Sequence, residues 1–172
     1  MDRRTVVAAL AALLGGCTDR VHDLAASTPS DIDVRSRYVP DDPLIDAAGL
    51  TGRQNDTETH VSSFRSDTDA IGVLADDAVA ARTFLEGTEF VDDGGRFVLL
   101  VVQRLASPGV DLRLGSVSRV GDRALRIGAD EVGTVTDGEP VVHTLLIRIA
   151  DERGPPERVT VSVEDDRVSV TV

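Results

Sequence analysis

The second half of the chain repeats short apolar segments at spacings that suit β-strands, and this pattern restricts the fold more than any other feature. Near the C-terminus, valine occupies every second position in residues 159–163 and again in residues 168–172. Such alternation places the apolar side chains on one face of a strand. Residues 97–102 and 145–147 are apolar at every position, which is typical of strands covered on both faces. These segments predict a mainly β fold.

Glycine- and proline-containing turns separate the expected strands, which we place at residues 60–65, 96–106, 110–120, 123–129, 141–150, 159–163 and 168–172. Between Leu114 and Val117 the apolar alternation changes phase, so Gly115-Ser116 is expected to form a β-bulge. Residues 131–140 are expected to form a loop. The succession of short strands predicts a β-sandwich or an open antiparallel barrel.

One or two short helices are expected before the central strands. Ser66 or Asp67 is suited to cap a helix N-terminus, and good helix formers follow as far as Gly87. Asp76-Asp77 interrupts this region, which favours two short helices over one.

The first residues of the chain have the composition of an export signal. Arg3 and Arg4 precede an uninterrupted apolar run from Val6 to Leu14. A helix needs about 20 apolar residues to cross a bilayer, so this run is too short to span one. It fits the apolar part of a removable signal peptide, which we place at residues 1–16.

Two motifs in this segment resemble known targeting signals. Arg3 and Arg4, followed by Thr5 and apolar residues, resemble a twin-arginine export signal. Leu14-Gly15-Gly16-Cys17 resembles the lipobox of prokaryotic lipoproteins, whose cysteine carries a diacylglyceryl-type lipid. The resemblance implies that the mature chain begins at Cys17 and is held by lipid to the extracytoplasmic face of the cell membrane. A buried N-terminal helix with an incidental cysteine is the alternative.

The chain is expected to form one globular domain on a tether. Cys17 is the only cysteine, so no intramolecular disulfide can form. Residues 17–57 are rich in Asp, Ser, Thr and Pro without sustained periodicity, so we expect a flexible acidic spacer after the lipidated cysteine. Asn55 lies in an Asn-Asp-Thr sequon, and both N-glycosylation and an unmodified loop residue remain open. Residues 58–172 are expected to form the β-rich domain.

The composition is strongly acidic, with a net charge of −12, and all 18 basic residues are arginine. Together with the lipobox, the absence of Lys and Trp resembles the exported lipoproteins of halophilic archaea, which implies an acidic surface that stays hydrated in salt. At about 1 M salt the Debye length is roughly 3 Å, so charges then attract only at direct contact. No basic stripe or aromatic platform suggests a nucleic acid partner.

The order of elements over residues 60–165 also resembles the PrcB-like domain family, found at the C-terminus of a subunit of bacterial surface protease complexes. In both, a polar strand and a helix precede a strongly apolar strand, a glycine-containing turn and a run of short strands. Where that family has a Gly-Gly-aromatic turn, this chain has Pro108-Gly109-Val110. No functional residue is therefore carried over from it.

No residue pattern in the chain indicates catalysis, metal binding or a cofactor. His22, His60 and His143 have no second ligand at a spacing that zinc sites use, so solvated or edge positions are favoured. Asp92-Asp93-Gly94-Gly95 lacks the alternating ligands of a calcium loop and is expected to be a turn. The chain has no Gly-x-Ser-x-Gly motif and no lysine for a Schiff base.

Arginines in or beside the expected strands are a further feature of the second half. Because Arg forks suit carboxylates and phosphates, they are expected either to line one sheet face as an anion-contacting surface or to pair with Asp and Glu across strands on a solvated face. The residues concerned are Arg104, Arg113, Arg119, Arg123, Arg126 and Arg148.

The sequence thus favours a non-enzymatic lipoprotein that binds membrane lipid through Cys17 and contacts an envelope protein. The alternative is a solute-capturing lipoprotein, or an accessory subunit of an envelope hydrolase, that uses a pocket between helix and sheet. A polar pocket would favour capture and a flat exposed patch would favour protein contact.

Overall fold

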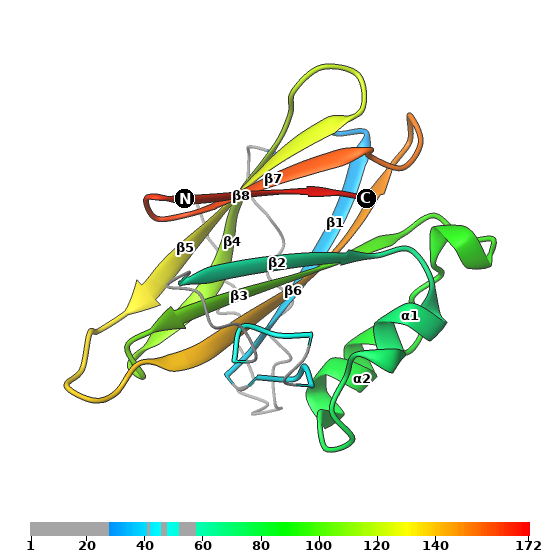
Figure 1. Cartoon of the computed structure of the whole chain (residues 1–172). Helices are drawn as coiled ribbons and strands as arrows, with labels where there is room; N and C mark the ends of the chain where they lie inside the picture. Colours follow the sequence, from blue (N-terminus) through cyan, green and yellow to red (C-terminus); the bar gives the residue numbers. More distant parts are fainter. Residues whose placement is uncertain (1–27, 41, 46–47, 52–57) are drawn as a thin grey trace, which may run out of the picture.

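A computed structural model describes residues 28–40, 42–45, 48–51 and 58–172. In this part of the chain, eight strands form two four-stranded sheets that pack face to face, and two short helices lie against the outside of one sheet (Figure 1). The mainly β fold with two short helices before the central strands is therefore confirmed. The two separate sheets correspond to the sandwich rather than the barrel.

The first sheet has the strand order β1-β6-β3-β2, and each neighbouring pair is antiparallel. Its central strands are the two segments that are apolar on both faces. The bounds are β1 Ile32–Val39, β6 Val141–Asp151, β3 Val98–Ala106 and β2 Thr59–Phe64.

The second sheet has the order β4-β5-β7-β8 and mixes both strand directions. β5 and β7 pair in parallel, and the other neighbours are antiparallel. The parallel pair arises because β6, which lies between them in the chain, crosses to the first sheet. The bounds are β4 Val110–Arg119, β5 Ala124–Gly133, β7 Arg158–Val163 and β8 Asp166–Thr171.

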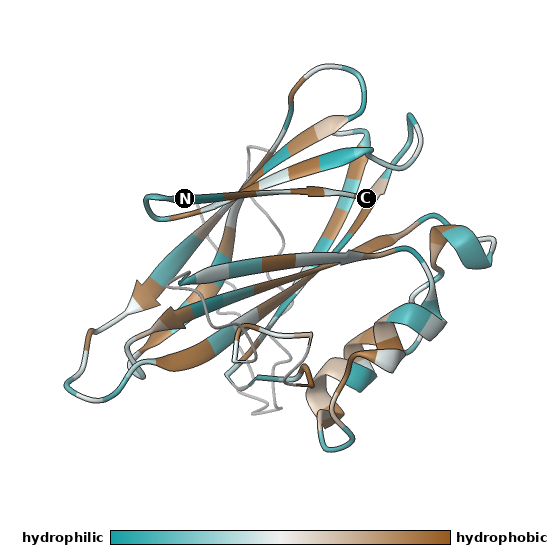
Figure 2. Cartoon of the chain, in the orientation of Figure 1, coloured by the Kyte–Doolittle hydropathy of each residue, from teal (hydrophilic) through white to brown (hydrophobic). Residues whose placement is uncertain are grey.

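The main core lies between the two sheets. Alternate residues of β3 and β6 face the inner side of the second sheet and are almost completely buried, and the apolar bands on these strands are visible in Figure 2. The alternating valines of β7 contribute Val159, Val161 and Val163, all fully buried. Burying apolar surface stabilises the fold by about 25 cal/mol per Å². This core therefore stabilises the fold without an intramolecular disulfide.

A second, smaller core lies between the outer face of the first sheet and the helices α1 (Asp67–Gly72) and α2 (Val79–Leu85). The Ser66 side chain caps α1 by accepting a hydrogen bond from the Asp69 N–H at 3.2 Å, as predicted. The two helices are separate, as the Asp76-Asp77 interruption predicts. Neither they nor any other helix in the described residues is long and apolar enough to cross a bilayer.

The predicted start of the globular domain near residue 58 is wrong, because β1 lies within the expected spacer. β1 pairs with β6 along its whole length, and Ile32, Val34 and Tyr38 contact the main core. β6 is a central strand, with β1 hydrogen-bonded to one edge and β3 to the other. Charged residues alternate with the apolar ones in β1, so its composition resembles that of the polar segments around it.

Two further details of the strands test the sequence pattern. The register of β4 against β5 shifts between Leu114 and Ser116, which confirms the predicted bulge. A side chain at Gly115 would meet a carboxylate oxygen of Asp130 at 2.2 Å, so the bulge places its backbone against that residue. The predicted loop at residues 131–140 is shorter than expected, since β5 continues to Gly133.

A candidate binding cleft beside the helices

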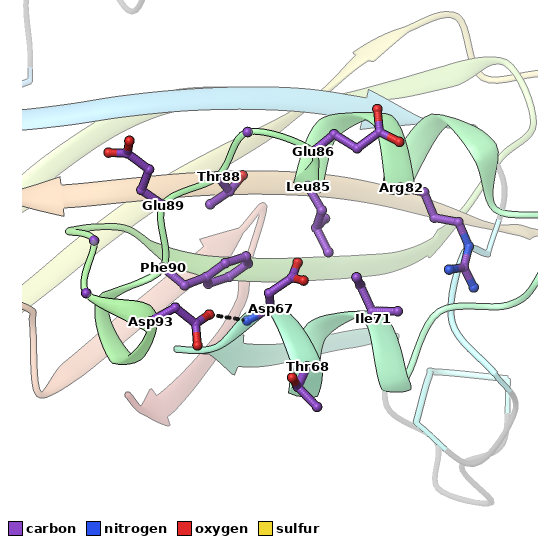
Figure 3. A pocket seen from close by; sticks show the side chains of 13 residues that line it. Asp67, Thr68, Ile71, Arg82, Leu85, Glu86, Thr88, Glu89, Phe90 and Asp93 are labelled. Atoms are coloured by element: carbon purple, nitrogen blue, oxygen red, sulfur yellow. Dashed lines mark hydrogen bonds between the residues drawn. The ribbon is translucent and has the colours of Figure 1, made fainter.

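A cleft of about 820 Å³ lies on the helical side of the molecule. Its walls come from α1, α2, the segment after α2 and the short 3₁₀ helix η1 (Val91–Asp93). Figure 3 shows Leu85 and Phe90 between two groups of acidic side chains, with Arg82 at one end. The volume falls within the range of roughly 300–1,000 Å³ that is usual for ligand sites.

The local sequence explains how the cleft forms. α2 ends before Gly87, which has a φ of 74° and lets the chain reverse without a Cβ clash. Phe90 then inserts into the smaller core, where it is fully buried. Its carbonyl accepts a hydrogen bond from the Gly95 N–H at 2.7 Å, which closes η1 into a tight turn before β3. The expected turn at Asp92-Asp93-Gly94-Gly95 therefore forms one wall of the cleft.

The rim of the cleft is acidic. Glu86 and Glu89 lie along one margin, and Asp67 and Asp93 lie on the other (Figure 3). A carboxylate oxygen of Asp93 accepts a hydrogen bond from the Asp67 N–H at 2.8 Å. Among the described residues, the carboxylates of Asp67, Glu86 and Glu89 form no ion pair.

Arg82, the one basic residue in the lining, does not neutralise this rim. Its guanidinium donates to the carbonyls of Leu74 and Ala75, at 3.3 and 3.1 Å, and lies 3.7 Å from the Asp76 carboxylate. These contacts hold Arg82 against the connection between α1 and α2. The rim therefore carries excess negative charge, and its carboxylates line the cleft.

The lining favours a polar, positively charged ligand. Leu85 and Phe90 are buried, and only Ile71 offers a substantial apolar surface, with 39% of it exposed. The lining contains no histidine, cysteine or lysine that could act as a base or nucleophile with these carboxylates. Over the described residues, no group of His, Cys, Asp and Glu is arranged to hold a metal ion.

The residues predicted to direct export and anchoring lie outside the described part of the chain. These are Arg3, Arg4, Leu14, Gly15, Gly16 and Cys17, and the same holds for His22 and for the possible glycosylation site Asn55.

The remaining two histidines are buried, so the expectation of solvated or edge positions is wrong for His143, on the central strand β6. His60 does lie on the edge strand β2, as expected, but is only 7% exposed. His143 faces the main core from β6. Its Nδ1 lies 2.7 Å from the Tyr38 hydroxyl and its Nε2 lies 3.0 Å from the Ser107 carbonyl oxygen. These contacts satisfy both ring nitrogens of His143 and leave neither for a metal.

The six arginines do not line one sheet face, so that alternative is wrong. The other alternative, pairing with Asp and Glu, holds for Arg104, Arg119 and Arg123. Arg104 and Arg148 belong to the first sheet, whereas the others lie on or beside strands of the second. The six arginines are divided between the sheets because β3 and β6 belong to the first sheet and β4 and β5 to the second. Arg113 and Arg126 are exposed on the outer face of the second sheet, and Arg123 pairs with Glu157 at 2.8 Å.

Arg104 instead joins the two sheets at one end of the sandwich. Its guanidinium contacts Glu131 on β5 at 2.8 Å, Asp166 on β8, and Glu58 at 3.2 Å. Burial alone would lower its pKa, but the hydrogen bond to Glu131 and the charges of Asp166 and Glu58 raise it above the ordinary arginine value. This arginine is a structural contact and is not available to a ligand.

Sequence reasoning gave a pocket between helix and sheet only as an alternative and named none of its residues, although they all lie within one continuous stretch of the chain, residues 67–95. The usable signals were Gly87 after α2 and the paired glycines at 94 and 95, which mark two reversals around a buried Phe90. Comparison of the chain with models of protein families, with curated proteins and with solved structures found no match.

Proposed function

We propose that the protein is a lipid-anchored, non-enzymatic binding module on the extracytoplasmic face of the membrane, and that the cleft receives a cationic group of another envelope component. Anchoring is inferred from the lipobox-like sequence that ends at Cys17. The binding role is inferred from one observation, the acidic rim of the cleft, whose carboxylates at Asp67, Glu86 and Glu89 lack partners among the described residues.

The chemistry of the lining defines the ligand. A guanidinium or ammonium group can pair with the carboxylates of the rim, and the small exposed surface of Ile71 can cover part of an aliphatic stem. An arginine or lysine side chain on a protein partner has both parts. In molar salt only such direct contacts survive, because screening removes longer-range attraction.

A second candidate, capture of a small cationic solute, is favoured by the polar lining of the cleft and by its volume, which is large enough for a whole polyamine. The two candidates differ in what the cleft contacts beyond the cation. A partner protein adds surface outside the cleft, whereas a solute lies within it.

The test measures binding to the purified chain of a short oligo-arginine peptide, of spermidine and of an oligo-glutamate peptide, at low and at molar salt. The double variant Asp67→Asn, Glu86→Gln should weaken oligo-arginine binding roughly two- to thirty-fold, the sum of two exposed ion pairs. The control Asp137→Asn, Glu139→Gln removes two exposed acids in the segment between β5 and β6 and should leave the affinity unchanged.

Equal losses in both double variants would show that binding depends on overall charge, and would refute the role of the cleft. Binding of spermidine with at least the affinity of the peptide would favour solute capture. Binding of the oligo-glutamate peptide in its place would contradict both candidates.

Anchoring is tested separately in the native host. Cys17→Ser should release the protein into the medium or leave it unprocessed, because stable anchoring needs lipid chains or an equivalent second signal. Replacement of Arg3 and Arg4 by lysine should block export, since the twin-arginine receptor reads the guanidinium pair. Unchanged membrane fractionation of the first variant, or normal surface delivery of the second, would contradict the corresponding proposal.

A further inference from the structure

The outer face of the first sheet carries an arginine without a carboxylate partner. Arg148 lies on β6 beneath α2, with its guanidinium carbon 4.4 Å from the centre of the Phe84 ring and 5.9 Å from that of Phe97. Its Nη1 donates to the Thr88 hydroxyl at 3.0 Å, and its Nε is buried with no hydrogen-bond partner. Among the described residues, no carboxylate lies within 4 Å of it.

Arg104 and Arg119, whose side chains are each 12% exposed, differ from Arg148 in this respect. Arg104 and Arg119 each contact two or more carboxylates. The chain has 30 acidic residues and 18 basic ones, so carboxylates are plentiful and their number does not explain why Arg148 has no carboxylate partner.

The nearest strand adds a second positive charge. Arg35 on β1 is the register partner of Arg148 on β6, so the two side chains lie opposite each other on the same sheet face. Like charges in this position destabilise a sheet. The pKa of Arg148 is lowered, first by burial and then by the charge of Arg35, and Asp33 offsets only part of this.

Asp33 is the carboxylate beside this group, and it pairs with Arg96 and Arg35 but not with Arg148. It accepts a hydrogen bond from Arg96 at 2.8 Å and lies 4.0 Å from Arg35. Arg96 in turn lies over the Phe97 ring, at 4.9 Å, the ring that Arg148 also approaches. Arg35 and Arg96 therefore share one carboxylate, which has no contact with Arg148.

We propose that Arg35 and Arg148, with Arg96 beside them, bind an oxyanion such as a phosphate group. Such a ligand would accept hydrogen bonds from these guanidinium groups and relieve the repulsion between the cross-strand arginines. Guanidinium groups match phosphate geometry with paired hydrogen bonds, which favours an oxyanion over a halide. The site is separate from the acidic cleft, and its ligand has the opposite charge.

The experiment follows the Nε–Hε signal of Arg148 in the ¹⁵N-labelled full-length chain, assigned by its loss in Arg148→Lys. Inorganic phosphate and glycerol 1-phosphate are titrated separately against sodium chloride at equal ionic strength. We expect a saturable shift with phosphate and none with chloride. Arg35→Gln, an exposed position, should weaken the affinity about two- to five-fold.

The matched control is Arg126→Gln, which removes an exposed arginine from the second sheet and should leave the titration unchanged. Tighter binding of inorganic phosphate identifies a free ion as the ligand, whereas equal or tighter binding of glycerol 1-phosphate identifies an esterified headgroup. Absence of a saturable shift with either compound would overturn the proposal, as would an Arg35→Gln variant that binds like the unmodified chain.

Discussion

Arg119, at the end of β4, and Asp151, at the end of β6, form a two-pronged ion pair that joins the two sheets at one end of the sandwich. Both terminal nitrogens of Arg119 donate to the Asp151 carboxylate. Nη2 does so at 2.9 Å and also donates to the Asp31 carboxylate at 3.0 Å. The Asp151 side chain is only 1% exposed. This pair and the contacts of Arg104 hold opposite ends of the main core closed.

Breaking this pair should destabilise the fold strongly. Asp151→Asn leaves the guanidinium of Arg119 without its main partner, and removing one member of a buried ion pair costs about 3 kcal/mol or more. The matched control is Asp92→Asn, which breaks the exposed pair with Arg65 and should cost no more than about 1 kcal/mol. Denaturant unfolding at constant salt measures both, and similar losses in the two variants would contradict a special role for Asp151.

The same pair predicts how stability depends on pH. Burial would raise the pKa of Asp151, but the hydrogen bonds from Arg119 and from the Arg153 N–H lower it below the ordinary value of 3.8. A carboxyl group whose pKa is lower in the folded state stabilises the fold above its unfolded pKa. This contribution is lost as the pH falls through the lower, folded value.

We therefore expect the free energy of unfolding to be steady from neutral pH to about 4 and to fall below it. Asp151→Asn should show a shallower acid decline than the unmodified chain. Unfolding curves across this pH range at fixed salt provide the measurement. A variant that loses stability on acidification as steeply as the original would show that other carboxylates carry the effect.

The place of β1 in the first sheet predicts where the chain can be shortened. A chain that begins at Thr28 should unfold in one cooperative transition, because it keeps every described strand. A chain that begins at Glu58 lacks β1, exposes one edge of β6 and loses the packing of Ile32 and Tyr38. We expect it to show no cooperative transition in calorimetry at any salt concentration. Cooperative melting of this shorter chain would mean that β1 is dispensable.

The hydrogen bonds of Gln103 predict that replacing this side chain will loosen the segment before β2. Its side-chain oxygen accepts a hydrogen bond from the Leu50 N–H at 2.7 Å, and its nitrogen donates to the Asp42 carboxylate at 2.5 Å. Because the amide is fully buried, Gln103→Leu leaves both partners unsatisfied and should cost about 1–3 kcal/mol. Hydrogen exchange at the Leu50 amide should accelerate by more than exchange at β3 and β6.

The control for this prediction is Thr144, which lies opposite Gln103 on β6 and is equally buried. Its hydroxyl has no hydrogen-bond partner among the described residues, so Thr144→Val should be neutral or stabilising. If both variants lose the same stability, then side-chain volume rather than hydrogen bonding determines the effect at this position.

Local pattern predicted most of the strands and helices. The valines at 159, 161 and 163 point inward because successive side chains in a strand alternate between faces, whatever the partner strand is. The separation of α1 from α2 and the bulge at Gly115 also follow from neighbouring residues. The motif around Cys17 belongs to the same class, since it is defined by residues that are adjacent in sequence.

The tertiary structure alone decided which segments meet. Period-two alternation identifies the apolar face of a strand but carries no information about the strand beside it, because partner choice depends on the path of the connections and on shared core packing. For this reason the parallel pairing of β5 with β7, the insertion of β1 beside β6, and the ion pair of Arg119 with Asp151 were not predicted. The facing arginines at 35 and 148 likewise meet only because distant segments pack together, whereas the acid-rimmed cleft is formed by one continuous stretch, residues 67–95.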